Sequence, residues 1–334
     1  MSNVLITGIT GMVGSHLTDF LLKNTDWEIY GMARWRSPID NIEHLINNIN
    51  NKSRLHLVYG DLNDESSLAN IFKHHKFDYI FHLAAQSFPQ TSFSMPINTL
   101  ETNVIGTYKL LDKINEYSHE ARVHVCSSSE VFGKVAREFT PIKEETNFHP
   151  ASPYAISKVG TDLIGQYFAE AHDLHTITTR MFTHTGPRRG DVFAESTFAK
   201  QIAMIEAGYL EPIVKVGNLD SLRTFADVRD AVRAYYVCVT KDLPPGSVYN
   251  IGGNFTCTIG ALLNKLLSIS TAKKVKVEVD PTRLRPIDAD LQIPDTSKFK
   301  LDTGWQPEIS FDETMEDLLN YWRTKVKNGP MLQR

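Results

Sequence analysis

The first half of the chain alternates short apolar runs with segments whose apolar residues recur at the spacing of an amphipathic helix. The apolar runs predict strands at Val4–Thr7, Ile29–Met32, Leu55–Tyr59, Tyr79–Leu83 and Val123–Cys126. The helical patterns between them cover Met12–Lys23, Ser66–His74, Thr99–Tyr117 and Pro153–Ala171. Continuous apolar strands that alternate with helices are typical of a parallel sheet covered on both faces. The pattern therefore predicts an α/β fold with a doubly wound parallel Rossmann sheet.

The alternation loosens after about residue 176. Strands are predicted at Thr176–Met181, Ile213–Val216 and Ser247–Ile251, with helices at Thr197–Glu206 and Val228–Val239. Because no long linker or internal repeat separates the two halves, we expect a smaller C-terminal substrate lobe interwoven with the first domain. The expected dinucleotide-binding domain is 1–175 with a returning segment 224–252, and the expected lobe is 176–223 with 253–334.

Composition narrows the class of protein. The 334 residues are 42% hydrophobic and 22% charged, with a net charge of −4, which favours a globular protein over a nucleic-acid binder. No apolar run approaches the roughly 20 residues that span a bilayer, and no leader pattern precedes Val4, so we expect a cytoplasmic protein without membrane contact. Cys126, Cys238 and Cys257 are too few and too scattered for a disulfide framework or a zinc site, so no metal is expected. Cys126, in an apolar strand, is expected to be a buried thiol.

A glycine-rich turn follows the first strand. Gly8 would permit the tight turn, Gly11 would let the backbone approach a pyrophosphate, and Gly14 would let the helix pack closely on the strand. The helix then begins at Met12 and Val13, whose amides would face the phosphates. The alternative is a glycine turn without a ligand, but the strand before it and the helix after it favour a dinucleotide site.

The ends of the following strands carry further candidate cofactor contacts. Arg34 stands where NAD-binding sites usually carry a carboxylate, which favours the 2′-phosphate of NADP; NAD is the alternative cofactor, and a solvated cation is the alternative interpretation of Arg34. Further candidates at these strand ends are Asp61, Leu62, Leu83, Ala84 and Ala85. Asn103 is expected inside a helix, where asparagine is a poor helix former, so it would be either a satisfied core residue or a support for the site.

Tyr154 and Lys158 lie one helical turn apart, an arrangement that suits acid–base chemistry. A tyrosine has an ordinary pKa near 10, and a nearby ammonium would favour the phenolate, so Tyr154 could take a proton from a sugar hydroxyl. Ser128 would hold the same hydroxyl. Glu130 points to the same side as Ser128 if the strand continues, and a carboxylate there could remove a carbon-bound proton and then protonate a departing hydroxyl. The alternative for Glu130 is a surface residue.

These motifs together resemble those of the extended short-chain dehydrogenase/reductases. Within that group, the segments Ala85-Gln86-Ser87, Gly186–Gly190, Lys215–Arg223 and Arg283–Pro286 are similar to stretches of GDP-mannose 4,6-dehydratases and of GDP-4-keto-6-deoxymannose reductases. The resemblance implies a catalytic set of Ser128, Glu130, Tyr154 and Lys158. It implies substrate contacts from Gln86, Ser87, Thr183, Arg189, Lys200, Arg223, Arg285 and Asp288.

The resemblance implies a lyase that uses NADP as a catalytic cofactor. It would convert GDP-mannose or a GDP-manno-heptose to the 4-keto-6-deoxy sugar by oxidation at C4, loss of water across C5–C6 and hydride return to C6. The alternative is a GDP-4-keto-sugar reductase or a C4 dehydrogenase or epimerase. Thr183 stands where these families usually carry Asn, which bears on sugar recognition. Relatives are commonly homodimers or homotetramers, and the helices at Thr99–Tyr117 and Pro153–Ala171 are the implied interface.

Overall fold

The computed structural model describes residues 1–284 and 291–332. Its main feature is a seven-stranded parallel sheet in the order β10-β6-β5-β4-β1-β2-β3. The strands are β1 (Asn3–Thr7), β2 (Glu28–Ala33), β3 (Leu55–Tyr59), β4 (Tyr79–His82), β5 (Arg122–Cys126), β6 (Thr176–Met181) and β10 (Val248–Ile251). The predicted doubly wound Rossmann sheet is confirmed. Strand β6, which the expected boundary assigned to the second lobe, lies inside this sheet between β5 and β10.

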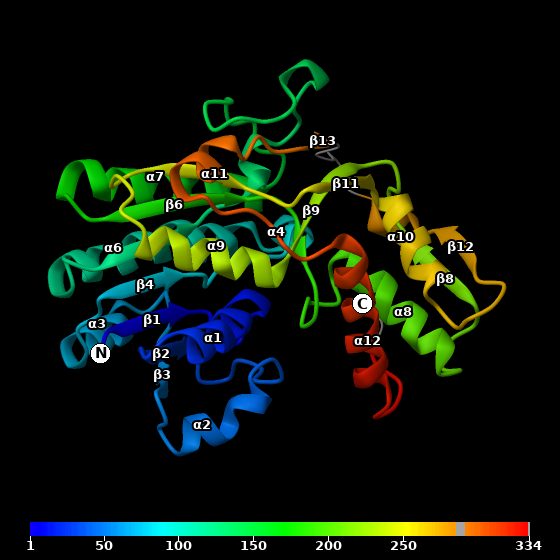
Figure 1. Cartoon of the computed structure of the whole chain (residues 1–334), viewed down its shortest axis with the longest axis horizontal. Helices are drawn as coiled ribbons and strands as arrows, with labels where there is room; N and C mark the ends of the chain where they lie inside the picture. The colour runs from blue at the N-terminus through cyan, green and yellow to red at the C-terminus, as the bar shows by residue number, and fades with distance from the viewer. Residues whose placement is uncertain (285–290, 333–334) are drawn as a thin grey trace.

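Helices cover both faces of the sheet (Figure 1). Helices α1 (Met12–Asn24) and α9 (Val228–Thr240) pack together on one face, and α3 (Glu65–His74), α6 (Gly106–Tyr117) and α7 (Pro153–His172) pack together on the other. Strand residues alternate between the two cores, since Val4 and Ile6 pack toward α1 whereas Leu5 packs toward α3 and α6. Both faces of the sheet are therefore shielded from solvent by helices, as the continuous apolar strands require.

The helix before α6 is interrupted. Short helix α5 (Pro96–Leu100) runs into one turn of π-helix, Glu101–Ile105, and then into α6. The sequence predicted this region as one helix from Thr99 and did not anticipate the π turn. Asn103 lies within it, and π turns of this kind often occur at functional sites.

The second lobe lies beyond the carboxyl ends of the main strands (Figure 1). Helices α8 (Ala194–Glu206), α10 (Ile259–Ser268) and α12 (Phe311–Val326) share an apolar core with two small sheets. The sheet strands are β7 (His184–Thr185), β8 (Ile213–Val216), β9 (Leu222–Asp227), β11 (Phe255–Thr258), β12 (Lys276–Val279) and β13 (Leu291–Gln292). The remaining short helices include α2 (Ile46–Asn50), α4 (Pro89–Ser94) and α11 (Ser297–Thr303).

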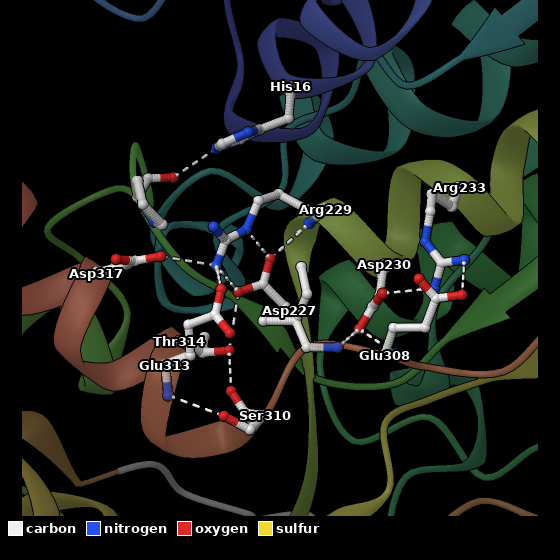
Figure 2. A network of polar contacts seen from close by, with 12 residues as sticks. His16, Asp227, Arg229, Asp230, Arg233, Glu308, Ser310, Glu313, Thr314 and Asp317 are labelled. Atoms are coloured by element: carbon white, nitrogen blue, oxygen red, sulfur yellow. Dashed lines mark hydrogen bonds and ion pairs between the residues drawn. The ribbon is translucent and has the colours of Figure 1, made fainter. Parts of the chain in front are cut away.

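A polar network fastens the lobe to the main domain at the end of β9 (Figure 2). Asp227 is buried, caps α9, accepts two hydrogen bonds from the Arg229 guanidinium at 2.8 Å and accepts another from the Thr314 hydroxyl of α12 at 2.8 Å. The Asp230 carboxylate accepts hydrogen bonds from the backbone amides of Glu308 and Ile309, which precede α12. Strand β9 is thereby held between the two parts of the molecule.

Among the described residues, none of the helices has both the length and the apolar character needed to cross a bilayer. Within the same residues, no group of three or more histidine, cysteine or carboxylate side chains is arranged to hold a metal ion.

Candidate active site

Helix α7 presents Tyr154 and Lys158 beside the end of β5. Ser152 caps the helix by accepting from the Ala155 amide at 3.0 Å, and Pro153 occupies the first turn, where its missing N–H costs nothing. Farther along, Asp162 holds the Arg180 guanidinium of β6 through two bonds of 2.9 Å, with Asp162 fully buried. The cap and this ion pair fix α7 along its length, so the two candidate catalytic side chains have a set position.

Glu130 lies in a short 3-10 helix, Ser129–Phe132, that follows β5, and Ser128 is its N-cap residue. The Ser128 hydroxyl accepts from the Glu130 amide at 3.2 Å, and Ser128 lies close enough to the phenol of Tyr154 to lower the pKa of that phenol. Val131 and Phe132 are fully buried on the inner side of the turn. Because these anchors hold the turn, Ser128 and Glu130 lie beside Tyr154 at the end of β5.

The electrostatics of the pair on α7 differ from the prediction. Burial raises the pKa of Tyr154, and this outweighs the opposing hydrogen bond from Ser128. Burial also lowers the pKa of Lys158, whose Nζ donates to the Cys126 carbonyl at 2.7 Å. The expected net lowering of the Tyr154 pKa by the nearby ammonium was therefore wrong for the protein as it stands, because both side chains are removed from water.

Cys126 was expected to be buried, and this was wrong: it is partly exposed, whereas Cys238 and Cys257 are buried. Cys126 is the last residue of β5, and its side chain packs only partly against the core that α9 covers. Its sulfur lies 3.6 Å from the Tyr235 hydroxyl.

The glycine turn after β1 has the geometry of a dinucleotide cradle. Gly8 has φ +73°, and a Cβ there would lie 2.9 Å from the Cα of Ala84. A Cβ on Gly14 would lie 2.3 Å from the Gly8 carbonyl oxygen. Gly11 begins α1 with no side-chain cap, and the first turn, at Met12 and Val13, carries no acidic residue. The uncapped, uncharged helix start fits the pyrophosphate of a dinucleotide.

The strand ends around this turn are also in place. The Thr7 hydroxyl accepts from the amides of Leu83 and Ala84, both at 3.0 Å, which holds the end of β4 against the glycine turn. Leu62 is buried and contacts Gly106, while Asp61 receives the Asn63 amide. Ala85 is partly buried.

Arg34 is exposed, as are its neighbours Trp35 and Arg36. The segment that follows folds back, since the Asn41 side chain donates to the Thr10 carbonyl at 3.0 Å. The sequence pattern did not indicate Asn41, because only the folded chain brings it beside the glycine turn. Arg34 is thus available at the edge where a 2′-phosphate would lie.

Asn103 serves both roles that the sequence left open. It is buried, its amide donates to the Gln86 carbonyl and the Ser157 hydroxyl at 2.9 Å each, and its side-chain oxygen accepts from the Gln86 amide. Its own carbonyl accepts from both Thr107 and Thr161. The π turn makes this carbonyl available to Thr161 on α7. Asn103 therefore ties the loop after β4 to the catalytic helix.

The predicted substrate residues of the segments that follow β4 and β6 have varied surroundings. The Gln86 side chain folds back onto Phe88 and the Thr99 hydroxyl, so in this conformation it supports the loop. Ser87 is exposed and Thr183 partly buried, and the Thr183 carbonyl accepts from the Ala226 amide.

Two predicted cations of the lobe are held by other groups of the chain. Arg189 bonds Glu195 at 3.0 Å and lies 3.5 Å over the Phe193 ring. Lys200 is buried, donates to Asp191 at 2.7 Å and also donates to the Leu332 carbonyl near the C-terminus. Substrate contact by Lys200 would therefore involve the segment around Leu332, which the sequence did not indicate.

Arg223, the third predicted cation of the lobe, pairs with Glu130: its Nη1 is 3.8 Å from Glu130 Oε1, with both side chains largely buried. Gln292 stands in register with Arg223 on the neighbouring strand, and both polar atoms of its amide are buried without a hydrogen-bond partner among the described residues. The sequence pattern did not indicate Gln292. Arg285 and Asp288 lie outside the described residues.

Comparisons with known proteins identify the family of the chain. The family model for GDP-mannose 4,6 dehydratase matches residues 5–318. GDP-mannose 4,6-dehydratase of Yersinia enterocolitica is 32% identical, with 96% of this chain and 93% of that protein aligned. The human GDP-mannose 4,6 dehydratase is 32% identical, with 95% and 90% aligned. Among solved structures, RMD from Pseudomonas aeruginosa complexed with NADPH is 27% identical with a TM-score of 0.83, covering 98% of this chain and all of that one.

Proposed function

The chain belongs to the GDP-mannose 4,6-dehydratase family and is a GDP-sugar 4,6-dehydratase, and we propose that Ser128, Glu130, Tyr154 and Lys158 carry its chemistry on a GDP-mannose-like substrate. The observation that carries the assignment is the position of Glu130. Its backbone amide donates a hydrogen bond to the Ser128 hydroxyl, and Ser128 lies beside the Tyr154 phenol. Oxidation at C4 does not require Glu130, since Ser128, Tyr154 and Lys158 can serve it, whereas removal of the C5 proton needs a further base at the same sugar.

Tyr154 accepts the proton of the C4 hydroxyl, and Ser128 orients that hydroxyl by a hydrogen bond. Oxidation to a ketone acidifies the neighbouring C5–H, which Glu130 removes. Glu130 then returns this proton to the C6 hydroxyl, which leaves as water and creates the C5–C6 double bond. When bound, NADP supplies the hydride acceptor and donor and, in its oxidised form, a positive charge that favours the Tyr154 phenolate.

The cradle formed by the turn at Gly8, the start of α1 and the exposed Arg34 supports NADP(H) as the cofactor. NAD is the alternative. RMD from Pseudomonas aeruginosa, one of the similar solved structures, binds NADPH, while the dTDP-glucose 4,6-dehydratase of Streptomyces venezuelae, with a TM-score of 0.83, was solved with NAD. Within the chain, the division into a cofactor domain and a substrate lobe remains part of the proposal, with β6 moved to the cofactor domain.

The chain also carries a surface that suits a second copy of itself. Helices α6 and α7, with the π turn before α6, expose a set of large apolar side chains on the side away from the sheet, namely Ile105, Tyr108, Ile156, Leu163 and Tyr167. Two such helix pairs can pack face to face about a two-fold axis, which supports a homodimer. A Leu163→Glu variant should then elute as a monomer in light-scattering chromatography, and an unchanged mass would contradict this interface.

The function is tested by mixing the purified protein with GDP-mannose and, separately, with GDP-manno-heptose, in the presence of catalytic NADP and no reductant. Loss of one water, measured by mass spectrometry, is the expected result and identifies the sugar. Unchanged mass with both sugars would contradict dehydration and favour the reductase or the C4 dehydrogenase or epimerase.

A further inference from the structure

We propose that Arg223 is shared between Glu130 and the diphosphate of the substrate, and so makes the position of the Glu130 carboxylate depend on whether the nucleotide sugar is bound. This inference rests on the proposed function, which makes Glu130 the base for the C5 proton. It goes beyond a diphosphate contact, because it makes Arg223 a positioning residue for the elimination step.

The first observation is the distance across the site. Arg223 Nη1 lies 3.8 Å from Glu130 Oε1, and the two side chains are 12% and 15% exposed. A carboxylate so nearly removed from water is stabilised by a cation at this range. The contact is looser than a direct hydrogen bond of about 2.9 Å, so a small shift of the guanidinium can exchange one anion for another.

The second observation is that the two residues belong to different parts of the molecule. Glu130 lies in the turn after β5 of the main sheet, where Gly133 donates to the Glu130 carbonyl at 3.1 Å. Arg223 lies on β9 of the lobe, paired with Cys257 on one side and Gln292 on the other. The ion pair thus spans the two parts, between which a nucleotide sugar would lie.

The third observation is that the backbone of β9 is held in place. Its far end, Asp227, is held by the Arg229 guanidinium and by the Thr314 hydroxyl of α12 (Figure 2). Because the backbones at both ends of the pair are fixed, redistribution between Glu130 and a phosphate takes place in the Arg223 side chain. A guanidinium carries five N–H donors in a planar fork, so it can hold a phosphate and a carboxylate on different edges.

The chemistry then follows a definite order. Without a diphosphate, the guanidinium draws the Glu130 carboxylate toward β9. When the diphosphate binds, it accepts hydrogen bonds from some of the guanidinium N–H groups, and the carboxylate turns toward the sugar. There the carboxylate accepts the C5 proton and passes it to the C6 hydroxyl. The ion pair therefore holds the Glu130 carboxylate away from the sugar position when no substrate is bound. When substrate is bound, the carboxylate is directed toward the sugar.

A double-mutant cycle in GDP binding tests the shared guanidinium without any turnover. Glu130→Gln removes the competing carboxylate, so we expect GDP to bind at least about threefold more tightly, in line with couplings between adjacent charges. In the Arg223→Gln background, the same Glu130→Gln change should leave GDP affinity unchanged. An equal gain in both backgrounds would reflect only general repulsion between Glu130 and the phosphates and would overturn the proposal, as would no gain in either.

A kinetic measurement tests the positioning role. In Arg223→Lys, C4 oxidation should slow less than elimination, so reduced cofactor accumulates in rapid mixing with GDP-mannose and exchange of the C5 hydrogen with D₂O falls by at least tenfold. If Arg223 only binds the diphosphate, KM rises, both steps slow together and no reduced cofactor accumulates. Arg323→Lys is the matched control, because Arg323 pairs with Glu206 within the lobe. Failure of the proposed function would show separately, as wild-type protein that releases no water.

Discussion

Removal of the Asp162 carboxylate is expected to loosen the catalytic helix and to destabilise the whole protein. Asp162 is fully buried on α7 and holds the Arg180 guanidinium by two bonds of 2.9 Å. In Asp162→Ala, Arg180 keeps its bond to the Glu144 carbonyl and its position 4.6 Å from the Phe148 ring, but loses its counter-ion. Leaving one member of a buried pair uncompensated costs about 3–5 kcal/mol.

This free energy converts to a melting-temperature change. An unfolding entropy of about 2.1 cal/mol/K per residue, applied to the 334 residues of the chain, gives a fall in Tm of about 4–7 °C. Thermal unfolding followed by circular dichroism measures it. Asp242→Ala, in the exposed pair that Asp242 makes with Arg122, is the matched control and should shift Tm by no more than about 1 °C.

The double variant Asp162→Leu/Arg180→Met separates the pair from the space it fills. Replacing both charges with apolar groups should recover most of the lost stability, because the cost lies in the unpaired guanidinium. A Tm for Asp162→Ala within about 1 °C of wild type would refute the reasoning. A double variant as unstable as the single one would show that packing, and not charge, holds α7 on β6.

Three further outcomes are expected. Gly14→Ala should weaken NADP binding at least tenfold in a fluorescence titration, because its Cβ would lie 2.3 Å from the Gly8 carbonyl oxygen and push α1 away from the turn; unchanged affinity would contradict the cradle. A thiol reagent at pH 8 should label Cys126 first, because burial raises the pKa of Cys257 to about 11 and that of Cys238 further, and faster labelling of either buried thiol, read by peptide mapping, would be inconsistent with this. The contribution of several buried histidines to stability against urea should be complete above about pH 6.5 and should decline as pH falls toward 4. Burial lowers the pKa of these histidines, so in this range they bind protons only after unfolding; a flat profile would contradict this expectation. These histidines are His16, His82, His124 and His184.

The sequence predicted the main sheet well, for a physical reason. Strands such as Val4–Thr7 are apolar throughout because both faces are covered, and each is followed by a helix with a clear periodicity, so local pattern and global fold agree. The convergence of Ser128, Glu130 and Tyr154 was predicted for the same reason, since each follows a strand end or opens a helix.

What the sequence did not predict depends on contacts between distant segments. The direction of the Tyr154 pKa change depends on burial, which local spacing does not report. The pairing of Lys200 with the Leu332 carbonyl joins residues far apart in the chain. The contact between Arg223 and Glu130 likewise depends on how the lobe packs against the main sheet. The sequence therefore indicated both residues but not the ion pair between them.

The π turn at Glu101–Ile105 also sets how far α5 is rotated about the helix axis relative to α6. One residue of an α-helix corresponds to a rotation of about 100°, so the extra residue in this turn sets which way α5 faces relative to α6. Helix α5 contacts α7, whereas α6 contacts both α3 and α7. Deleting a single residue here would convert the turn to α-helix and swing Asn103 away from Ser157 while leaving composition and hydrophobicity almost unchanged. The length of this stretch, more than the identity of most of its residues, thus becomes the property that an engineered variant has to preserve.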